Sequence, residues 1–223
     1  MRLILFDIDG TLIRSGGAGK LAMESALAAA FGLAEVLDGV PYAGRTDRAI
    51  GHDLLALHGI DPLEHHRQNL HAAYLAVLPD SLARVPGTVL PGVRALLDAL
   101  RGEPVAVGLI TGNLRAGAEV KLRHFGLWDY FPFGGYGDAH LDRDGVARDA
   151  LAAAESLHAR PFDDIWVVGD TPLDVACART IGAKSLAVAT GWHTPEALAE
   201  SRPDWLLADL ADTESLLAAF RAR

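Results

Sequence analysis

Four aspartates in two closely spaced pairs could carry out metal-dependent chemistry. Asp7 and Asp9 are separated by one residue, and Asp170 and Asp174 by three. Residues two apart on an extended chain lie ~6–7 Å from each other on the same side, so Asp7 and Asp9 could flank one small reacting group. Carboxylates without histidine or cysteine are ligands that Mg²⁺ prefers, and clustered carboxylates repel one another unless a cation is bound. If the two pairs meet in the fold, the sequence predicts a Mg²⁺ site formed by Asp7, Asp9, Asp170 and Asp174.

The same residues have simpler local interpretations. An aspartate followed by Gly10 is ordinary in a turn after a strand. Asp170 or Thr171 could cap a helix that begins with Pro172, whose missing N–H is harmless in a first turn. Only a fold that brings the two pairs together would separate the chemical interpretation from the local one.

A second polar segment, Thr111-Gly112-Asn113, directly follows the apolar run Val105–Ile110. The hydroxyl of Thr111 could cap the next helix. Together with backbone N–H groups near a helix N-terminus, it could instead bind phosphate oxygens. On the second interpretation, Thr111 is a catalytic candidate, and Gly112 and Asn113 are substrate-binding candidates.

Short apolar runs predict the strands that must position these side chains. They are Leu3–Phe6, Val105–Ile110, Ile165–Val168, Ser185–Ala189 and, more weakly, Trp205–Leu207. Helical patterns follow at Gly92–Arg101, Arg115–Phe125, Asp149–His158 and Asp174–Thr180. This alternation predicts an α/β fold with a Rossmann-like parallel sheet covered on both faces. Ligands of such sheets bind beyond the carboxyl ends of the strands, where each candidate aspartate and Thr111 would lie.

Residues 16–84 interrupt the alternation and show no convincing strand. Helical patterns there cover Gly19–Phe31, Asp47–His58 and Pro62–Leu78, with Asp47 and Asp61 as expected N-caps. We therefore expect a helical cap domain at 16–84, inserted into a catalytic core formed by 1–15 and 85–223.

Composition limits the classes of partner. The chain has 223 residues, of which 50% are hydrophobic, and a formal net charge of −9. An acidic chain is repelled by phosphate backbones, so nucleic acid is not expected as a partner. No apolar run approaches the ~18 residues of a membrane helix, and Cys177 is the single cysteine, so we expect a cytoplasmic protein without a membrane partner. Nothing in the sequence indicates an oligomeric state.

Three of these segments together resemble the haloacid-dehalogenase-like (HAD) hydrolases. Asp7–Thr11, DIDGT, resembles the first signature of that family. Thr111 with Gly112 and Asn113 is similar to the second, and Gly169–Asp174, GDTPLD, to the fourth. The order of these motifs, and the strands that they follow, agree with the pattern of the family over essentially the whole chain. A helical cap just after the first motif is typical of the phosphoglycolate-phosphatase and β-phosphoglucomutase type.

The resemblance implies a Mg²⁺-dependent phosphatase. Asp7 would attack phosphorus to form an aspartyl-phosphate, and Asp9 would protonate the leaving oxygen and then deprotonate water. Mg²⁺ would be held by Asp7, Asp170 and the backbone carbonyl of Asp9, with Asp174 in support, and Thr111 would bind a phosphate oxygen. Haloacid dehalogenases proper lack a carboxylate at the position of Asp9, which favours phosphoryl chemistry here.

The third signature of the family, a cation often followed by proline, is absent as such. Arg143 and Arg148 are the nearest cations to its expected place, and we favour Arg143, because an arginine fork could hold phosphate and Asp7 together. Lys121 is the other candidate. Since it lies about two turns into the helix after Thr111, we expect it to point away from the strand ends.

The substrate expected from the resemblance is a small phosphorylated metabolite. Arg45 and Thr46 lie in a segment, Gly44–Asp47, that resembles the substrate-specificity segment of such phosphatases, although a helix-start loop would look the same. Two other functions use similar residues. A phosphomutase would pass the phosphoryl group to a sugar, and a phospho-receiver module would need neither Asp9 nor a cap. The sequence does not identify the phosphomonoester.

Overall fold

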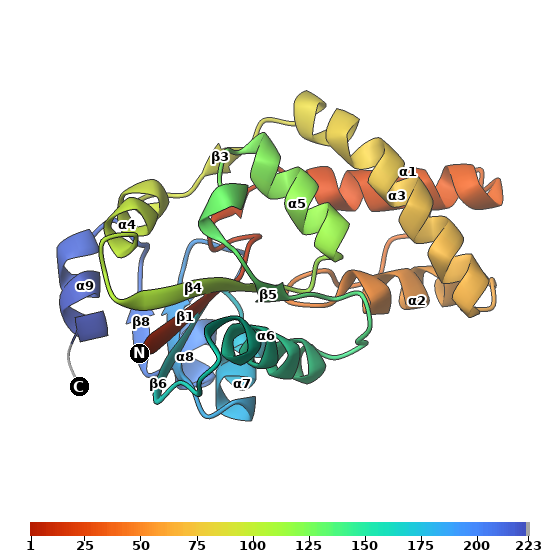
Figure 1. Ribbon diagram of the computed structural model, residues 1–223. Coiled ribbons are helices and arrows are strands. Elements are labelled where there is room, and N and C mark those ends of the chain that lie inside the picture. The colour runs from red at the N-terminus through yellow and green to blue at the C-terminus, as the bar shows by residue number, and fades with distance from the viewer. Residues whose placement is uncertain (222–223) are drawn as a thin grey trace.

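A six-stranded parallel sheet forms the centre of the protein (Figure 1). The computed structural model describes residues 1–221. The strands run in the order β5-β4-β1-β6-β7-β8. Their bounds are β1 Arg2–Phe6, β4 Val105–Ile110, β5 Gly134–Gly135, β6 Asp164–Gly169, β7 Lys184–Val188 and β8 Trp205–Leu207. The predicted α/β, Rossmann-like architecture is confirmed.

The register of the central strands explains why the site lies where it does. Phe6, the last residue of β1, is paired with Leu109 of β4 and Val168 of β6. The chain therefore leaves all three strands at one level, and the backbone N–H of Asp7 still donates to the carbonyl of Val168 at 2.9 Å. Residues that directly follow these strands must gather at one edge of the sheet.

Helices cover both faces of the sheet (Figure 1). One face carries α4 (Val93–Leu100), α5 (Arg115–His124), the short 3-10 helix η1 (Trp128–Tyr130) and α9 (Thr213–Arg221), and the other carries α6 (Arg143–His158), α7 (Pro172–Thr180) and α8 (Pro195–Glu200). Side chains of β1 alternate between the two cores. Ile4 and Phe6 pack with the first set of helices, and Leu3 and Leu5 pack with the second. Burial on both faces explains why β1 is apolar throughout.

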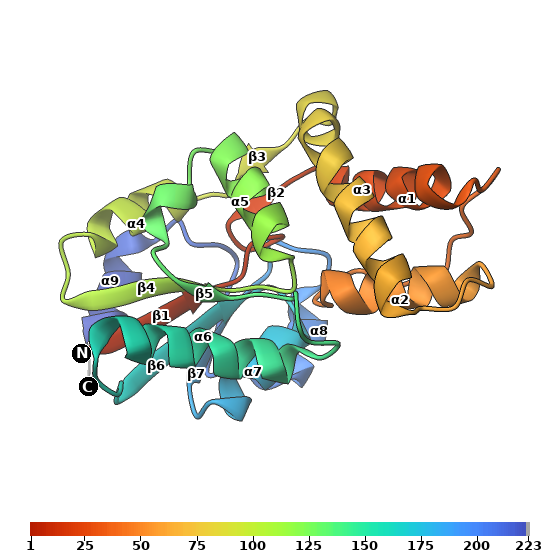
Figure 2. The ribbon, with the colours of Figure 1, turned by 45° about the vertical axis from the view of Figure 1, so that its right-hand side comes forward.

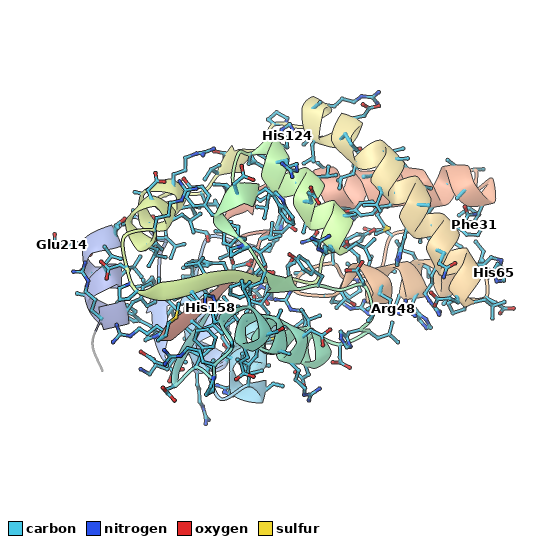
Figure 3. All side chains as sticks on the ribbon, in the orientation of Figure 1. Phe31, Arg48, His65, His124, His158 and Glu214 are labelled. Atoms are coloured by element: carbon cyan, nitrogen blue, oxygen red, sulfur yellow. The ribbon has the colours of Figure 1, made fainter. Side chains whose placement is uncertain are left out.

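Three helices form a separate layer beyond the carboxyl edge of the sheet (Figure 2). They are α1 (Ala18–Phe31), α2 (Asp47–Leu57) and α3 (Glu64–Arg84), and they enclose an apolar cluster that includes Leu27, Leu54 and Tyr74. Phe31 and His65 mark the far end of this layer (Figure 3). We call residues 16–84 the helical insertion. It is joined to the sheet where β2 (Ile13–Arg14) pairs antiparallel with β3 (Thr88–Val89).

Several element ends differ from the sequence expectations. Helix α6 begins at Arg143 instead of Asp149, because Asp142 caps it by accepting from the N–H of Gly145 at 2.9 Å. Helix α3 continues through Pro79 to Arg84, where the buried Leu82 packs into the cluster of the insertion. None of the helices among residues 1–221 is long and apolar enough to span a bilayer.

The two expected N-caps in the insertion are wrong. Thr46, not Asp47, caps α2, since its extended backbone lets its hydroxyl accept from the N–H of Ala49 at 3.1 Å. The carboxylate of Asp47 is used elsewhere, as shown below. The N-cap position of α3 is Leu63, not Asp61, and makes no side-chain cap hydrogen bond.

Candidate active site

Three carboxylates from separate parts of the sequence meet at the carboxyl ends of β1 and β6. One oxygen each from Asp7, Asp170 and Asp174 lies within 4.8 Å of the others. All three side chains are buried, with at most 4% of the residue exposed. Buried carboxylates at this spacing repel one another, so the arrangement requires positive charge close by.

The carboxylate of Asp170 is enclosed by backbone. Gly10 has a φ of 89°, and a Cβ there would overlap this carboxylate, as would one at Gly191. The hydroxyl of Thr11 donates to Oδ1 of Asp170 at 3.1 Å. The glycine in the first motif is thus required both by its left-handed conformation and by the close approach of Asp170.

Asp174 belongs both to a helix cap and to the carboxylate cluster. Its Oδ2 accepts from the N–H of Thr171 at 3.0 Å and from the Thr171 hydroxyl at 2.7 Å, and Thr171 in turn accepts from the N–H of Asp174. This is a capping box at the start of α7, with Pro172 in the first turn. The capping interpretation is therefore correct for Thr171, and the cap fixes Asp174 beside Asp170.

Arg143 supplies one cation to the cluster. Its Nη1 donates to Oδ1 of Asp7 at 3.3 Å, and its Nη2 donates to Oδ1 of Asp174. As the first residue of α6, it is 6% exposed, whereas Arg148 lies one turn further on and is exposed. Of the two arginines considered from the sequence, the structure brings only Arg143 to the carboxylates.

Lys121 is a second buried cation, and the expectation that it points away is wrong. Its Nζ donates to Oδ2 of Asp9 and to Oδ1 of Asn113, both at 2.6 Å. Helical side chains tilt toward the helix N-terminus, and the long stem of lysine spans the distance back to the strand ends. The sequence signal was a single lysine on the helix after the second motif, but its direction depends on how α5 packs on the sheet.

The second motif forms a hydrogen-bonded unit with Asp9. The side-chain amide of Asn113 donates to Oδ2 of Asp9 and to the hydroxyl of Thr111, at 2.8 Å each. Thr111 is fully buried, and the Asp9 side chain is 39% exposed. A Cβ at Gly112 would overlap the backbone carbonyl of Arg45, so glycine at this position allows the start of α2 to lie close against the loop after β4.

The candidate residues of the insertion lie beside the site, but the side chain of Arg45 donates to the carbonyl of Pro41 and to Asp53 and not to the clustered carboxylates. Arg45 pairs with Asp53 at 2.7 Å, while Thr46 is buried at the start of α2. A cavity of about 290 Å³ lies against them. It is lined by Arg45, Thr46, Leu141, Asp142, Arg143, Asp144, Leu173 and Ala176. Since Arg143 both lines this cavity and contacts Asp7, the cavity adjoins the carboxylate cluster.

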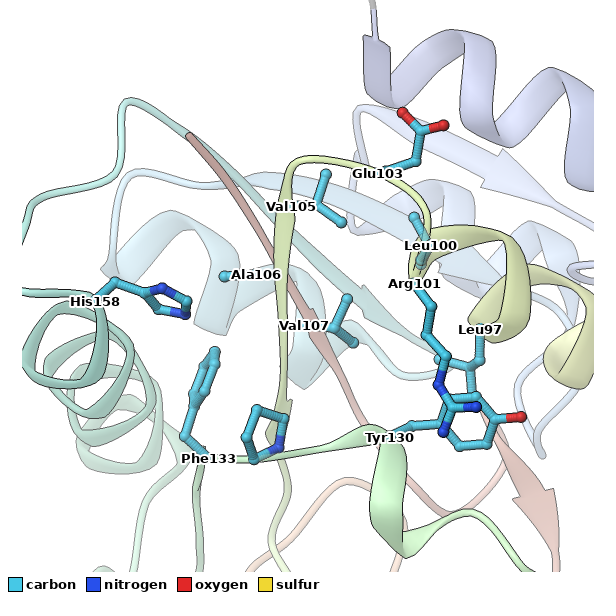
Figure 4. A pocket seen from close by; sticks show the side chains of 11 residues that line it. Leu97, Leu100, Arg101, Glu103, Val105, Ala106, Val107, Tyr130, Phe133 and His158 are labelled. Atoms are coloured by element: carbon cyan, nitrogen blue, oxygen red, sulfur yellow. The ribbon is translucent and has the colours of Figure 1, made fainter.

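A second cavity, of about 200 Å³, lies at the opposite end of β4 (Figure 4). Val105, Ala106 and Val107 line it together with Phe133 and His158. Val105, Ala106 and Val107 belong to the amino-terminal half of β4, and none of the clustered aspartates lines the cavity. The convergence of charged groups therefore favours the carboxyl edge as the active site.

Burial and neighbouring charges separate the acidities of the two aspartates of the first motif. Burial raises the pKa of Asp7 to about 7, although Arg143 opposes the rise, and burial also raises the pKa of Asp170 well above its ordinary value. Burial would raise the pKa of Asp9 too, but the charge of Lys121 and hydrogen bonds from Lys121, Asn113 and Ser15 lower it overall. A divalent cation would compensate the charge that disfavours ionised Asp7 and Asp170.

Comparison with known proteins identifies relatives along the whole chain. A family model of haloacid dehalogenase-like hydrolases matches residues 4–179, and a HAD-hydrolase-like model matches residues 146–213. The chain is 29% identical to phosphoglycolate phosphatase of Synechococcus elongatus over 95% of both proteins. It is 30% identical to phosphoglycolate phosphatase of Yersinia pseudotuberculosis over 95% of this chain and 91% of that one.

Solved structures share the fold at lower identity. A predicted phosphoglycolate phosphatase from Haemophilus somnus superposes with a TM-score of 0.74 at 19% identity, covering 96% of this chain and 97% of that one. CbbY from Rhodobacter sphaeroides in complex with phosphate gives 0.75 at 20% identity, covering 94% and 95%. At these identities the likeness establishes the fold alone.

Proposed function

The chain belongs to the haloacid dehalogenase-like hydrolases and is a phosphatase of that family, and we propose that it hydrolyses a small phosphomonoester through an aspartyl-phosphate on Asp7. The resemblance inferred from the three motifs is confirmed by the match over residues 4–179. The observation that carries the mechanistic proposal is the buried cluster of Asp7, Asp170 and Asp174.

Mg²⁺ fits the donor set of this cluster. Carboxylate oxygens are hard ligands, and no histidine or cysteine belongs to the group found among residues 1–221. We assign Asp7 and Asp170 as direct ligands. Asp174 supports the site, because its two oxygens already bind Arg143 and Thr171. Mg²⁺ bound here would neutralise charge on the phosphoryl group during in-line displacement.

The residues of the chain account for both half-reactions. A carboxylate oxygen of Asp7 forms a bond to phosphorus as the bond from phosphorus to the leaving oxygen breaks, and Asp9 gives that oxygen its proton. Asp9 then takes a proton from water, which attacks the same phosphorus, releases phosphate and restores Asp7. Arg143 orients Asp7 through Oδ1, and the hydroxyl of Thr111 binds a phosphoryl oxygen.

The helical insertion is proposed to act as a cap over the site. Its α2 begins against the loop that follows β4, where the N–H of Asp47 donates to the carbonyl of Gly112 at 2.7 Å. Arg45 and Thr46 line the cavity next to Arg143, where they would contact the part of a cytoplasmic phosphorylated metabolite distant from its phosphate. Closure would exclude water other than the reacting one.

The test compares Asp7→Asn with Asp163→Asn, a matched change at an exposed position just before β6. With p-nitrophenyl phosphate and Mg²⁺, Asp7→Asn should lose phosphate release while its circular dichroism stays that of the wild type, and Asp163→Asn should keep its activity. Wild-type turnover by Asp7→Asn would refute the assignment of the nucleophile. Formation of an isomer, without free phosphate, from a phosphosugar would favour a mutase instead.

A further inference from the structure

Lys121 is a buried charge that the proposed reaction does not yet use. It is 4% exposed, and its ammonium binds Asp9 and Asn113 at 2.6 Å each. A buried ammonium is costly unless it is paired and hydrogen-bonded, so this arrangement needs a reason beyond packing. Arg143 already binds Asp7 and Asp174, whereas Lys121 binds a different carboxylate, that of Asp9.

The two carboxylate oxygens of Asp9 have different hydrogen-bond partners. Lys121 and the amide of Asn113 both donate to Oδ2, at 2.6 and 2.8 Å. Within residues 1–221, Oδ1 has only a long contact of 3.5 Å with the hydroxyl of Ser15. Two short bonds to one oxygen fix the rotation of the carboxylate and leave the other oxygen available to exchange a proton.

The helical insertion encloses Lys121 from the other side. A Cβ at Gly19 of α1 would lie 3.2 Å from Nζ of Lys121, so α1 packs directly over the ammonium. Asp47 of α2 is 8% exposed, and its Oδ2 accepts from the N–H of Leu114 at 2.8 Å. Burial raises the pKa of Asp47 to about 6, and the charge of Lys121 is the largest influence opposing that rise. Leu114 is the N-cap residue of α5, the helix that carries Lys121, so the hydrogen bond from its N–H to Asp47 joins the start of that helix to the insertion.

We propose that Lys121 is a positioning residue that orients Asp9 for proton transfer, and that Asp47 of the helical insertion fixes the start of α5, the helix that carries Lys121. The inference rests on the proposed phosphatase function, since it gives a role to Asp9 in that reaction. It means that docking of α2 on the core completes the orientation of the group that protonates the leaving oxygen.

Dependence on the leaving group distinguishes positioning of Asp9 from a general structural role. The value of kcat/KM covers steps up to release of the leaving group. A nitrophenolate leaves with little help, whereas an unsubstituted phenolate needs its proton from Asp9. Lys121 lowers the pKa of Asp9, so its loss keeps Asp9 protonated over a wider pH range. Because the bond from Nζ that orients the carboxyl group is also lost, kcat/KM should still fall much more for phenyl phosphate than for p-nitrophenyl phosphate. A structural defect would lower both by the same factor.

The experiment measures both substrates with Lys121→Met and with the matched control Lys184→Met, which changes an exposed lysine at the start of β7. For Lys121→Met we expect a loss of about 10²-fold for phenyl phosphate, at the lower end of what general acid catalysis contributes, and below about 10-fold for p-nitrophenyl phosphate. Lys184→Met should change neither value. An equal loss for both substrates, or none, would overturn the inference.

Asp47→Ala provides a second variant, which also serves if Lys121→Met fails to fold, because alanine removes the acceptor for the N–H of Leu114. It should move the ratio of the two kcat/KM values in the same direction by a smaller factor. In the double variant with Lys121→Met it should cause no further change in this ratio, because Asp47 acts through the helix that carries Lys121. A ratio that Asp47→Ala leaves at the wild-type value would refute the role of Asp47. If the wild type releases phosphate neither from these two substrates nor from small phosphorylated metabolites in the presence of Mg²⁺, the proposed function itself fails, and this inference with it.

Discussion

Replacement of Arg143 by methionine should destabilise the metal-free protein strongly. The side chain of Arg143 is 5% exposed, and its partners Asp7 and Asp174 are 6% and 2% exposed. Removing one partner of such a buried group leaves carboxylates without their cation, which costs about 3–5 kcal/mol. For a chain of this size each kcal/mol lowers Tm by about 2–4 °C, so we expect a decrease of about 6–20 °C. Mg²⁺ should reduce the difference, because it supplies positive charge to the same carboxylates.

The assay is thermal unfolding at pH 8 with EDTA and with excess Mg²⁺. Arg148→Met is the matched control, since Arg148 lies on the same helix and is exposed, and it should change the free energy of unfolding by no more than about 0.5 kcal/mol. A decrease of less than about 1 kcal/mol for Arg143→Met, or an equal decrease for both variants, would refute the view that Arg143 compensates the cluster. If Mg²⁺ does not reduce the difference in unfolding free energy between Arg143→Met and the wild type, the metal binds elsewhere.

Three further results are expected. Gly10→Ala should abolish phosphatase activity, because a Cβ there would overlap the carboxylate of Asp170. Gly32 is also left-handed but has open space around it, so Gly32→Ala should cost only about 1–2 kcal/mol of stability in urea unfolding. Thr171→Ala should cost about 1 kcal/mol and weaken Mg²⁺ binding in calorimetry, while Thr194→Ala at the cap of α8 should affect stability alone. The folded pKa of Asp7, about 7, lies above its ordinary value of 3.8, so its contribution to metal-free stability is present below pH 3.8 and is lost as pH rises through about 7. Mg²⁺ should therefore raise Tm more at pH 8 than at pH 6.

The sequence predicted the strands of the core because both faces of the sheet are covered. Val105–Ile110 and Trp205–Leu207 were predicted to the residue, since burial on both faces produces an uninterrupted apolar run. The two-residue strands β2, β3 and β5 were missed, because so few residues carry no periodicity. The first turn of α6 was missed because its polar residues and Gly145 do not resemble a buried helix face.

The site was predictable as far as backbone position determines it. Asp7 and Asp170 directly follow strands, so parallel pairing alone brings them together. Lys121 was not predictable in this way, because its place depends on the packing of α5 and on the reach of a flexible side chain. The sequence favours Asp47 as an N-cap, whereas in the fold it accepts a hydrogen bond from the N–H of Leu114 because α2 docks on the loop after β4.

Chemical trapping of the phosphorylated enzyme tests the central claim most directly. Asp9→Asn should still be phosphorylated by p-nitrophenyl phosphate, whose leaving group needs little protonation, but should hydrolyse the intermediate slowly. Acid quenching followed by borohydride reduction converts an aspartyl-phosphate to homoserine, which peptide mass spectrometry locates. We expect homoserine at position 7, dependent on substrate and Mg²⁺. Unmodified Asp7 together with homoserine at Asp170 or Asp174, or with no homoserine at all, would contradict the assignment of Asp7 as the nucleophile.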